Sequence, residues 1–465
     1  MDALLTDIEA LVGAGNVLTG EDVSRRSVDW LSGAPCRAQA IVRPASPQEL
    51  AAVMRLCHAA RQPVVAHGGL TGLVHGAEVA PDELAISLER MTAIEHVDPI
   101  GATLTVQAGA PLQAVQDAAE AAGLQFALDL GARGSCTIGG NIATNAGGVR
   151  VIRYGMMRQQ VLGLEAVLAD GTVVSSMNRM LKNNAGFDLK QLFIGSEGTL
   201  GIVTRAVLRL HPATPDVQTA LVACDTFEAL TGLLARTGNT LGGSLAAFEV
   251  MWQSHYRLLT TESGRHTPPI APEAPFFVIV ESLGHDPNHH ARQFSESLEA
   301  ALESGLISDA VIAHSDAQRR GIWAIREDIE GLIAALSPLL AFDVSLPIHA
   351  MADYVEALEA ALTRRWPEAR VVTFGHLGDG NLHLSISVGS AGPETRRAVE
   401  QCVYTPLAAL GGSVSAEHGI GLEKRDYLSL SRTPEEIALM HTLKQALDPY
   451  QLLNRHKVLA ATYPG

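Results

Sequence analysis

The chain of 465 residues has few basic residues, and they form no cluster. It carries 34 Lys and Arg against 50 Asp and Glu, which gives a formal net charge of −16. Because a polyanion is bound through a basic surface, this balance argues against nonspecific nucleic-acid binding. A local basic pocket for a small anion is still compatible with it.

Long apolar runs are also absent. No segment approaches the roughly 20 consecutive apolar residues that cross a bilayer, and the first residues do not open a secretory signal. Cysteines are few, odd in number and without C-x-x-C spacing: Cys36, Cys57, Cys136, Cys224 and Cys402. They indicate reduced thiols, and we therefore predict a cytoplasmic protein with no transmembrane segment.

The remaining composition is that of a folded globular protein, with 47% hydrophobic and 18% charged residues. The length suggests two or three domains. From Ala40 onward short β runs alternate with Ala-rich helices, and Ser46 caps a helix that extends to about Arg61. Residues 211–215 predict an interdomain linker, and strand-like runs return at 276–281, 339–346 and 371–388.

Glycine is concentrated in three segments, residues 67–73, 131–155 and 195–201. A glycine-rich turn after a strand exposes consecutive backbone N–H groups, which can hold a phosphate without a basic side chain. The first segment fits neither G-x-G-x-x-G nor G-x-x-x-x-G-K-[ST], so the two usual nucleotide motifs do not apply. Taken alone, it is either an ordinary turn or a phosphate site.

Residues 374–383 suggest two imidazoles on facing strands. Asp379-Gly380 predicts a two-residue hairpin turn, and counting outward from it pairs His376 with His383. Directly opposed residues have Cβ atoms roughly 4.5–5.5 Å apart, near enough for both rings to bind one ion. Glu417 and His418 add a carboxylate and a third imidazole in a glycine-flanked loop. Two His and one Glu form a common catalytic zinc set, which other divalent metals also fit; ordinary polar residues on a sheet are the alternative.

The three glycine segments, in order and spacing, resemble the FAD-contacting segments of the vanillyl-alcohol-oxidase/PCMH-type flavoproteins. The residues that carry the resemblance are Gly68-Gly69-Leu70-Thr71-Gly72, the stretch 135–148, and the stretch 195–204. The resemblance implies that the first segment holds the pyrophosphate, the second borders the isoalloxazine and the third lines the adenosine side. The implied FAD-binding residues are His67, Gly68, Gly69, Leu70, Thr71, Gly72, Ser135, Thr137, Gly139, Gly140, Asn141, Thr144, Asn145, Gly147, Gly148, Glu197, Gly198, Gly201, Ile202, Val203 and Asn454. No histidine stands where this branch attaches flavin covalently, so we expect noncovalent FAD.

The resemblance also implies an α+β fold, with a PCMH-type FAD-binding domain in two subdomains and a cap domain built on an antiparallel sheet. We expect an N-terminal helical cap at 1–35, the FAD domain at 36–213, the cap domain with the metal site at 214–420, and a return to the FAD domain at 421–465. One departure concerns Asn454-Arg455-His456-Lys457, where relatives usually have Asn-Pro-Gly-Lys. The conformation of that turn is therefore open.

Within the family, His376, His383 and Glu417-His418-Gly419 resemble the metal-dependent D-2-hydroxyacid dehydrogenases, a branch that includes D-lactate, glycolate and D-2-hydroxyglutarate dehydrogenases. This implies a divalent metal, with zinc favoured, at His376, His383 and Glu417. Flavin N5 would accept the hydride and His418 the hydroxyl proton. Similarity also places Arg326 on the α-carboxylate, which its planar fork suits. The alternative for Arg326 is an exposed helix residue paired with Glu330.

The substrate tail is left open. In the 2-hydroxyglutarate enzymes a lysine and an asparagine help to hold the substrate, and this chain has Ala341 and Ser385 at those places. The lost cation favours a shorter or less polar acid such as D-lactate, whereas Val28-Asp29-Trp30 is more similar to the hydroxyglutarate subgroup.

The implied partners are a small 2-hydroxyacid and an electron acceptor such as an electron-transfer flavoprotein, a quinone or a cytochrome. A homodimer is compatible with the sequence. Two other function classes stay open at this point: a zinc hydrolase that uses His376, His383 and Glu417 to activate water, and a noncatalytic flavin-binding protein.

Overall fold

The computed structural model describes residues 2–29 and 33–460, so Trp30 of the Val28-Asp29-Trp30 comparison lies outside the described residues. The chain divides into two compact units. Unit 1 comprises Met1–Gly148, Gly155–Ala213 and Glu417–Gly465; unit 2 comprises Val149–Tyr154 and Thr214–Ala416. The boundary after Ala213 falls in the predicted linker. The helical segment 1–35 is part of unit 1 rather than a body of its own.

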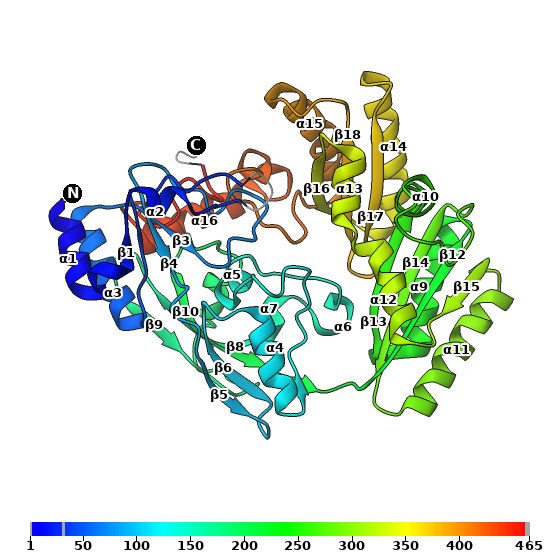
Figure 1. The fold of residues 1–465 in the computed structure, drawn as a ribbon, viewed down its shortest axis with the longest axis horizontal. Coiled ribbons are helices and arrows are strands. Elements are labelled where there is room, and N and C mark those ends of the chain that lie inside the picture. Colours follow the sequence, from blue (N-terminus) through cyan, green and yellow to red (C-terminus); the bar gives the residue numbers. More distant parts are fainter. Residues whose placement is uncertain (1, 30–32, 461–465) are drawn as a thin grey trace. The chain divides into compact units, whose positions relative to one another are not determined.

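Unit 1 begins with a small sheet in the order β1-β2-β4-β3 (Figure 1). Its strands are β1 (Val17–Leu18), β2 (Ala40–Val42), β3 (Val64–His67) and β4 (Leu84–Ser87), with β2 and β3 parallel to β4. Helices α1 (Asp2–Val12) and α3 (Pro47–Ala60) accompany it. The side chain of Ser46 accepts a hydrogen bond from the Glu49 N–H, and Arg61 ends α3 in the left-handed region, close to the predicted bounds.

A second, antiparallel sheet of unit 1 has the order β5-β6-β10-β8-β9. It consists of β5 (Ile94–Asp98), β6 (Thr103–Gln107), β8 (Val161–Val167), β9 (Val173–Ser176) and β10 (Ile202–Arg209). The accompanying short helices are α4 (Leu112–Ala121), α5 (Ile138–Ala143), α7 (Met157–Gln160) and α8 (Lys190–Phe193). One hydrophobic core joins both sheets and includes Ile8 of α1, Met54 of α3 and Ile138 of α5. The N-terminal helix α1 and the second glycine segment therefore pack into the same hydrophobic core.

Unit 2 is built on a seven-stranded antiparallel sheet in the order β15-β12-β14-β13-β17-β18-β16, drawn from green to orange in Figure 1. The strands are β12 (Asp216–Cys224), β13 (Leu245–Trp252), β14 (Phe276–Gly284), β15 (Asp309–Ile312), β16 (Leu340–Ser345), β17 (Arg370–His376) and β18 (Asn381–Ser387). Buried side chains of α10 (Gln253–Arg257), α12 (Asp316–Glu327) and α13 (Ile329–Leu336) pack against one face of β12, β14, β13 and β17 in a shared core. The unit also contains α9 (Phe227–Leu241), α11 (Pro287–Glu303), α14 (Met351–Arg365) and α15 (Pro393–Leu410). The predicted α+β class with an antiparallel sheet is confirmed.

A short piece of unit 2 comes from between two parts of unit 1. It contains α6 (Val151–Tyr154), and the Arg153 guanidinium donates a hydrogen bond of 2.7 Å to the Leu283 carbonyl at the end of β14. The Arg150 guanidinium lies 2.5 Å from the buried Glu281 carboxylate. Two cations therefore attach this piece to the C-terminal end of β14.

The hairpin of β17 and β18 differs from the predicted register. His376 pairs with Asn381 and Phe374 with His383, because the connection is a four-residue loop, 377–380, rather than the two-residue turn. Leu377 is fully buried inside this loop, and a Cβ on Gly378 would meet Ile152 at 2.4 Å. Tertiary packing thus removes Leu377 and Gly378 from the strand pairing. Because the shift is even, both histidines keep the same face of the sheet.

Candidate active site

The first two glycine segments are in contact within unit 1. A Cβ on Gly68 would lie 2.6 Å from Thr137 Oγ1, and a Cβ on Gly69 would lie 2.1 Å from the Ser135 carbonyl oxygen. The second distance is far below any real van der Waals contact with backbone. Only glycine therefore permits this approach, which explains why the residue type recurs here.

Asn454 connects the third glycine segment to β3. Its Nδ2 donates a 2.6 Å hydrogen bond to the Glu197 carbonyl, and its Oδ1 accepts one of 2.9 Å from the Ala66 N–H. The Glu197 N–H in turn donates to the Ala143 carbonyl at 2.8 Å. All three segments and Asn454 thus belong to one hydrogen-bonded region.

The turn after Asn454 keeps a left-handed conformation without Pro-Gly, since φ is 41° at Asn454 and 63° at His456. Arg455 holds it from outside through contacts of 2.6 Å to Glu83 and 2.5 Å to Asp82. Lys457 is 3% exposed and donates to the Glu78 carbonyl at 2.7 Å; its burial lowers the pKa to about 8. Ion pairs therefore replace the expected turn residues.

In unit 2, the carboxylate of Glu249 on β13 holds two of the predicted site residues. Its Oε1 is 2.8 Å from His376 Nδ1, and its Oε2 is 3.0 Å from Arg326 Nη2. Burial acts to raise the pKa of this carboxyl, but the neighbouring His376 and the Arg326 guanidinium outweigh it and hold the pKa below its usual range. With Nδ1 engaged by Glu249, Nε2 is the His376 nitrogen suited to a metal.

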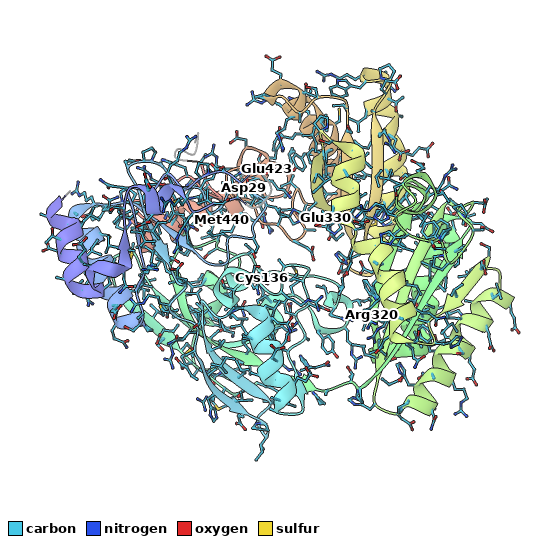
Figure 2. All side chains as sticks on the ribbon, in the orientation of Figure 1. Asp29, Cys136, Arg320, Glu330, Glu423 and Met440 are labelled. Atoms are coloured by element: carbon cyan, nitrogen blue, oxygen red, sulfur yellow. The ribbon has the colours of Figure 1, made fainter. Side chains whose placement is uncertain are left out.

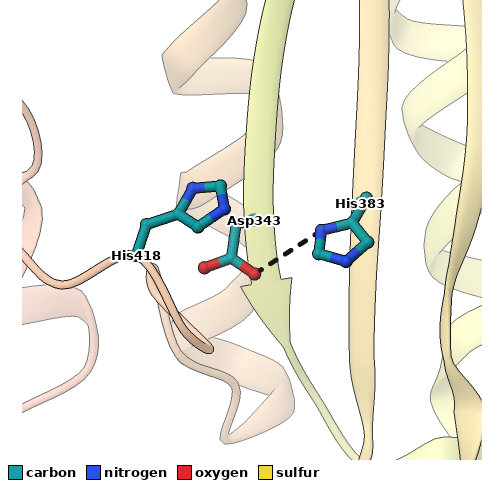
Figure 3. Close-up of side chains that lie close together, drawn as sticks. All are labelled: Asp343, His383 and His418. Atoms are coloured by element: carbon teal, nitrogen blue, oxygen red, sulfur yellow. Dashed lines mark ion pairs between the residues drawn. The ribbon is translucent and has the colours of Figure 1, made fainter. Parts of the chain in front are cut away.

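His383 has a carboxylate neighbour of its own. Its Nδ1 lies 3.8 Å from Asp343 Oδ1, as Figure 3 shows. Asp343 on β16 is fully buried and also accepts hydrogen bonds from Asn381 Nδ2 at 2.8 Å and from the Ala416 N–H at 3.1 Å. The rings of His376 and His383 are 5.2 Å apart between centroids. The structure therefore brings both predicted metal histidines together, although they are not paired in register.

Arg326 is 6% exposed, and its guanidinium lies over the Phe374 ring at 4.5 Å from the centroid. Its Nε and Nη2 have no hydrogen-bond partner among the described residues, because the contact with Glu249 is an ion pair without hydrogen-bond geometry. Helix α12 ends at Glu327, and the exposed Glu330 belongs to the next helix, α13 (Figure 2). The alternative of an exposed Arg326 paired with Glu330 is therefore wrong.

Glu417 and His418 open the last segment of unit 1, directly after Ala416 ends unit 2. Glu417 Oε1 accepts a hydrogen bond of 2.5 Å from the Gly148 N–H. The carboxylate of Glu197 accepts the N–H groups of Ile420 and Gly421 at 2.7 and 2.9 Å, which fixes the loop that carries His418. His418 is also drawn in Figure 3.

Comparison with known proteins assigns the family. A family model described as an FAD binding domain matches residues 38–176, and one described as the C-terminal domain of FAD linked oxidases matches residues 214–458. The chain belongs to the FAD-linked oxidases. The predicted family and FAD cofactor are thereby confirmed, and neither the zinc-hydrolase alternative nor that of a noncatalytic protein holds.

Curated relatives of this FAD-linked oxidase align over almost the whole chain. A mitochondrial D-2-hydroxyglutarate dehydrogenase of Bos taurus is 40% identical over 97% of this chain and 83% of its own length. A D-2-hydroxyglutarate dehydrogenase of Xanthomonas citri is 40% identical, covering 94% and 92%. A putative mitochondrial D-lactate dehydrogenase of Schizosaccharomyces pombe is 36% identical, covering 94% and 84%.

Solved structures share the fold of this FAD-linked oxidase at low identity. A substrate-bound p-cresol methylhydroxylase superposes with a TM-score of 0.77 at 15% identity, covering 100% of this chain and 98% of the other. An alkyldihydroxyacetonephosphate synthase gives 0.76 at 16% identity, covering 98% and 86%. Across the described residues, none of the helices has both the length and the apolar character to span a membrane.

The residues of unit 1 fit an FAD. The N–H groups of residues 68–73 donate no hydrogen bond to the described parts of the chain, so they are available to a phosphate. Thr137 Oγ1 and Asn141 Nδ2 are buried and also lack a partner there. His67 is buried against the Ala77 carbonyl, and burial lowers its pKa to about 4, so it adds no positive charge at neutral pH. The first segment therefore offers backbone amides rather than a basic side chain.

Sequence reasoning missed the two carboxylates of this FAD-linked oxidase that lie beside His376 and His383. Glu249 stands alone in the apolar strand Leu245–Trp252, and Asp343 stands alone in Leu340–Ser345. A single acidic residue within a buried strand needs a partner, because an unpaired buried charge is very costly. That pattern was the available signal.

Proposed function

We propose that this FAD-linked oxidase oxidises a D-2-hydroxyacid to the 2-oxoacid. The observation that carries the proposal is that Glu249 holds His376 and Arg326 with its two oxygens, at 2.8 and 3.0 Å. One partner suits a metal and the other a carboxylate, and a 2-hydroxyacid presents adjacent hydroxyl and carboxylate groups that match this pair. The relatives named D-2-hydroxyglutarate and D-lactate dehydrogenase support the same substrate class.

His376, His383 and Glu417 would hold the divalent metal, with zinc favoured by the two imidazoles and one carboxylate. Two facts support Glu417 as the third ligand. It is covalently next to Ala416, and the N–H of Ala416 is bound by Asp343, the carboxylate beside His383.

When bound, FAD supplies a hydride acceptor and the metal a Lewis acid for the 2-hydroxyl. Arg326 binds the C1 carboxylate through its guanidinium, whose Nε has no hydrogen-bond partner among the described residues. An imidazole nitrogen of His418 takes the hydroxyl proton. Glu249 keeps the Arg326 guanidinium over Phe374 and holds His376 in one tautomer.

The tail of the substrate would lie near the cross-strand pair Ala341 and Ser385. This pair shares a face with Asp343 and His383, one row away, and offers no charge. Arg370 follows on the same face but is paired with Glu262 at 3.2 Å. The substrate is therefore D-2-hydroxyglutarate, as the names of two relatives favour, or a shorter acid such as D-lactate.

The decisive experiment is an anaerobic screen in which D- and L-2-hydroxyacids of different tail length are mixed with the purified holoenzyme. We expect bleaching of the flavin absorbance by D-acids and not by their L-enantiomers. A flavin that no 2-hydroxyacid reduces would contradict the proposal. An electron-transfer flavoprotein, quinone or cytochrome acceptor, a homodimer and a cytoplasmic location remain predictions, and several relatives carry the word mitochondrial in their names.

A further inference from the structure

His255 is a buried polar residue that the proposed chemistry does not use. It lies on α10, is 0% exposed, and neither of its ring nitrogens has a hydrogen-bond partner among the described residues. Its neighbour Tyr256 is equally buried, but that hydroxyl donates to the Ile270 carbonyl at 2.8 Å. Burying an imidazole without partners costs free energy, and a phenyl ring would fill the same space without that cost.

The surroundings of His255 connect it to Arg326. Its ring lies 4.6 Å from the Phe374 ring between centroids, and the Arg326 guanidinium lies 4.5 Å from the centroid of the same ring. The His383 ring also contacts the Phe374 ring, with 5.1 Å between the two centroids. His255 is therefore beside the residues that would hold the substrate rather than in a remote part of the core.

The charge state of His255 follows from this location. Burial, and next the positive charge of Arg326, lower the pKa of His255 well below its usual value, so the ring is neutral at pH 7. A neutral imidazole presents one N–H donor. Together with Nε of Arg326, the N–H of His255 therefore leaves two donors around Phe374 that have no hydrogen-bond partner among the described residues. A carboxylate, with about four acceptor sites, is the small group that satisfies several donors at once.

We propose that His255 is a further substrate-binding residue, which donates its ring N–H to the same C1 carboxylate that Arg326 binds. The inference rests on the proposed function, because it assigns the carboxylate of the 2-hydroxyacid to this place. It also explains why an imidazole without partners is retained in the core. In the free enzyme the unpaired His255 imidazole lowers stability. In the complex the same imidazole donates a hydrogen bond to the substrate.

The test is His255→Phe, measured first by thermal unfolding and then by steady-state kinetics. We expect a higher Tm, because the unpaired polar group is removed, together with a KM raised roughly 10–150-fold and an unchanged kcat, as for a lost hydrogen bond to a charged group. The increase should be equal for each D-2-hydroxyacid that the wild type oxidises, since all share the C1 carboxylate. His255→Gln, which restores an N–H donor, should recover part of the affinity.

The matched control is His290→Phe, another buried histidine of unit 2. Its Nε2 is 2.7 Å from Ser282 Oγ and its Nδ1 contacts Asp216, so this substitution should lower the Tm and leave KM unchanged. A His255→Phe enzyme with a higher Tm and a wild-type KM would overturn the inference, as would a lower Tm or a KM effect confined to one tail length. A wild type whose flavin no 2-hydroxyacid reduces would instead defeat the proposed function, so the two failures are distinguishable.

Discussion

The two units of the molecule differ in the kind of group that would hold a ligand. Unit 1 offers backbone N–H groups in residues 68–73, and its close contacts require the absence of a side chain at Gly68 and Gly69. Unit 2 offers side chains on a sheet, with Glu249 hydrogen-bonded to His376 and Asp343 lying 3.8 Å from His383. The site in unit 1 depends on glycines that have no side chain. The site in unit 2 depends on charged side chains that are paired across strands.

This difference predicts different responses to substitution. A backbone site fails when a methyl group is added where space is lacking, even though no functional group is removed. A site of paired buried charges fails when one partner is neutralised, because the other charge then remains buried and uncompensated. Substitutions in the glycine segments should therefore remove FAD and leave the metal, and substitutions of the unit 2 carboxylates should do the reverse.

The largest expected effect is that of Gly69→Ala. The added Cβ would lie 2.1 Å from the Ser135 carbonyl, so the first glycine segment must move away from the second. We expect loss of FAD, measured as flavin absorbance in the supernatant after heat denaturation, while metal content persists. Gly134→Ala is the control, since a Cβ there meets nothing within 4 Å. A Gly69→Ala protein that retains stoichiometric FAD would break the contrast between the units.

His418→Gln tests a side chain of unit 1 that is proposed to act in chemistry rather than in binding. A positioned base is worth typically about 10²–10⁴-fold, so flavin reduction should slow by that factor in an anaerobic stopped-flow experiment. FAD and metal should both remain, because neither is assigned to this side chain. A rate within a few-fold of wild type would remove His418 from the proton-transfer role.

The same contrast explains which parts could be predicted from the sequence. The glycine segments are local in sequence, so their resemblance to a known family could indicate the FAD site. Helix α3 was also predictable, because Ser46 and Arg61 bound it by local chemistry. The register of the β17–β18 hairpin was not, since burial of Leu377 overrides the turn preference of Asp379-Gly380.

The partners of the site histidines were not predictable for a related reason. Glu249 and His376 are 127 residues apart, and only the sheet order β13-β17-β18-β16 brings them together. The sequence could indicate that the two histidines share a face, because the side-chain period of a strand is two. It could not indicate which carboxylate orients each imidazole.

Glu249→Gln tests the paired charges of unit 2. The amide cannot balance Arg326, and it can no longer hold His376 as a carboxylate does. Loss of such an outer partner typically lowers metal affinity about 10–100-fold, which titration with a metal chelator would measure, while FAD stays bound. Glu281→Gln is the matched control: its carboxylate is also 1% exposed but holds Thr219, Trp323 and Arg150. Its loss should lower the Tm without changing metal affinity, and equal metal loss in both variants would refute a specific role for Glu249.

The last substitution concerns the tail of the substrate, where this chain has Ala341 in place of the lysine of the 2-hydroxyglutarate enzymes. Ala341 is exposed and pairs with Ser385 one row from His383, so Ala341→Lys places an ammonium on the proposed tail side of the site. One recovered hydrogen bond to a charged group is worth about 1.5–3 kcal/mol, so kcat/KM for D-2-hydroxyglutarate relative to D-lactate should rise roughly 10–150-fold. Ala409→Lys adds the same charge at an exposed position of α15 and should leave the ratio unchanged. An unchanged ratio in Ala341→Lys would place the distal carboxylate elsewhere.

A wild type that already prefers D-2-hydroxyglutarate strongly would show that another cation holds the distal carboxylate. Arg370 lies on the same face of the sheet, so Arg370→Ala is the first substitution to test in that case.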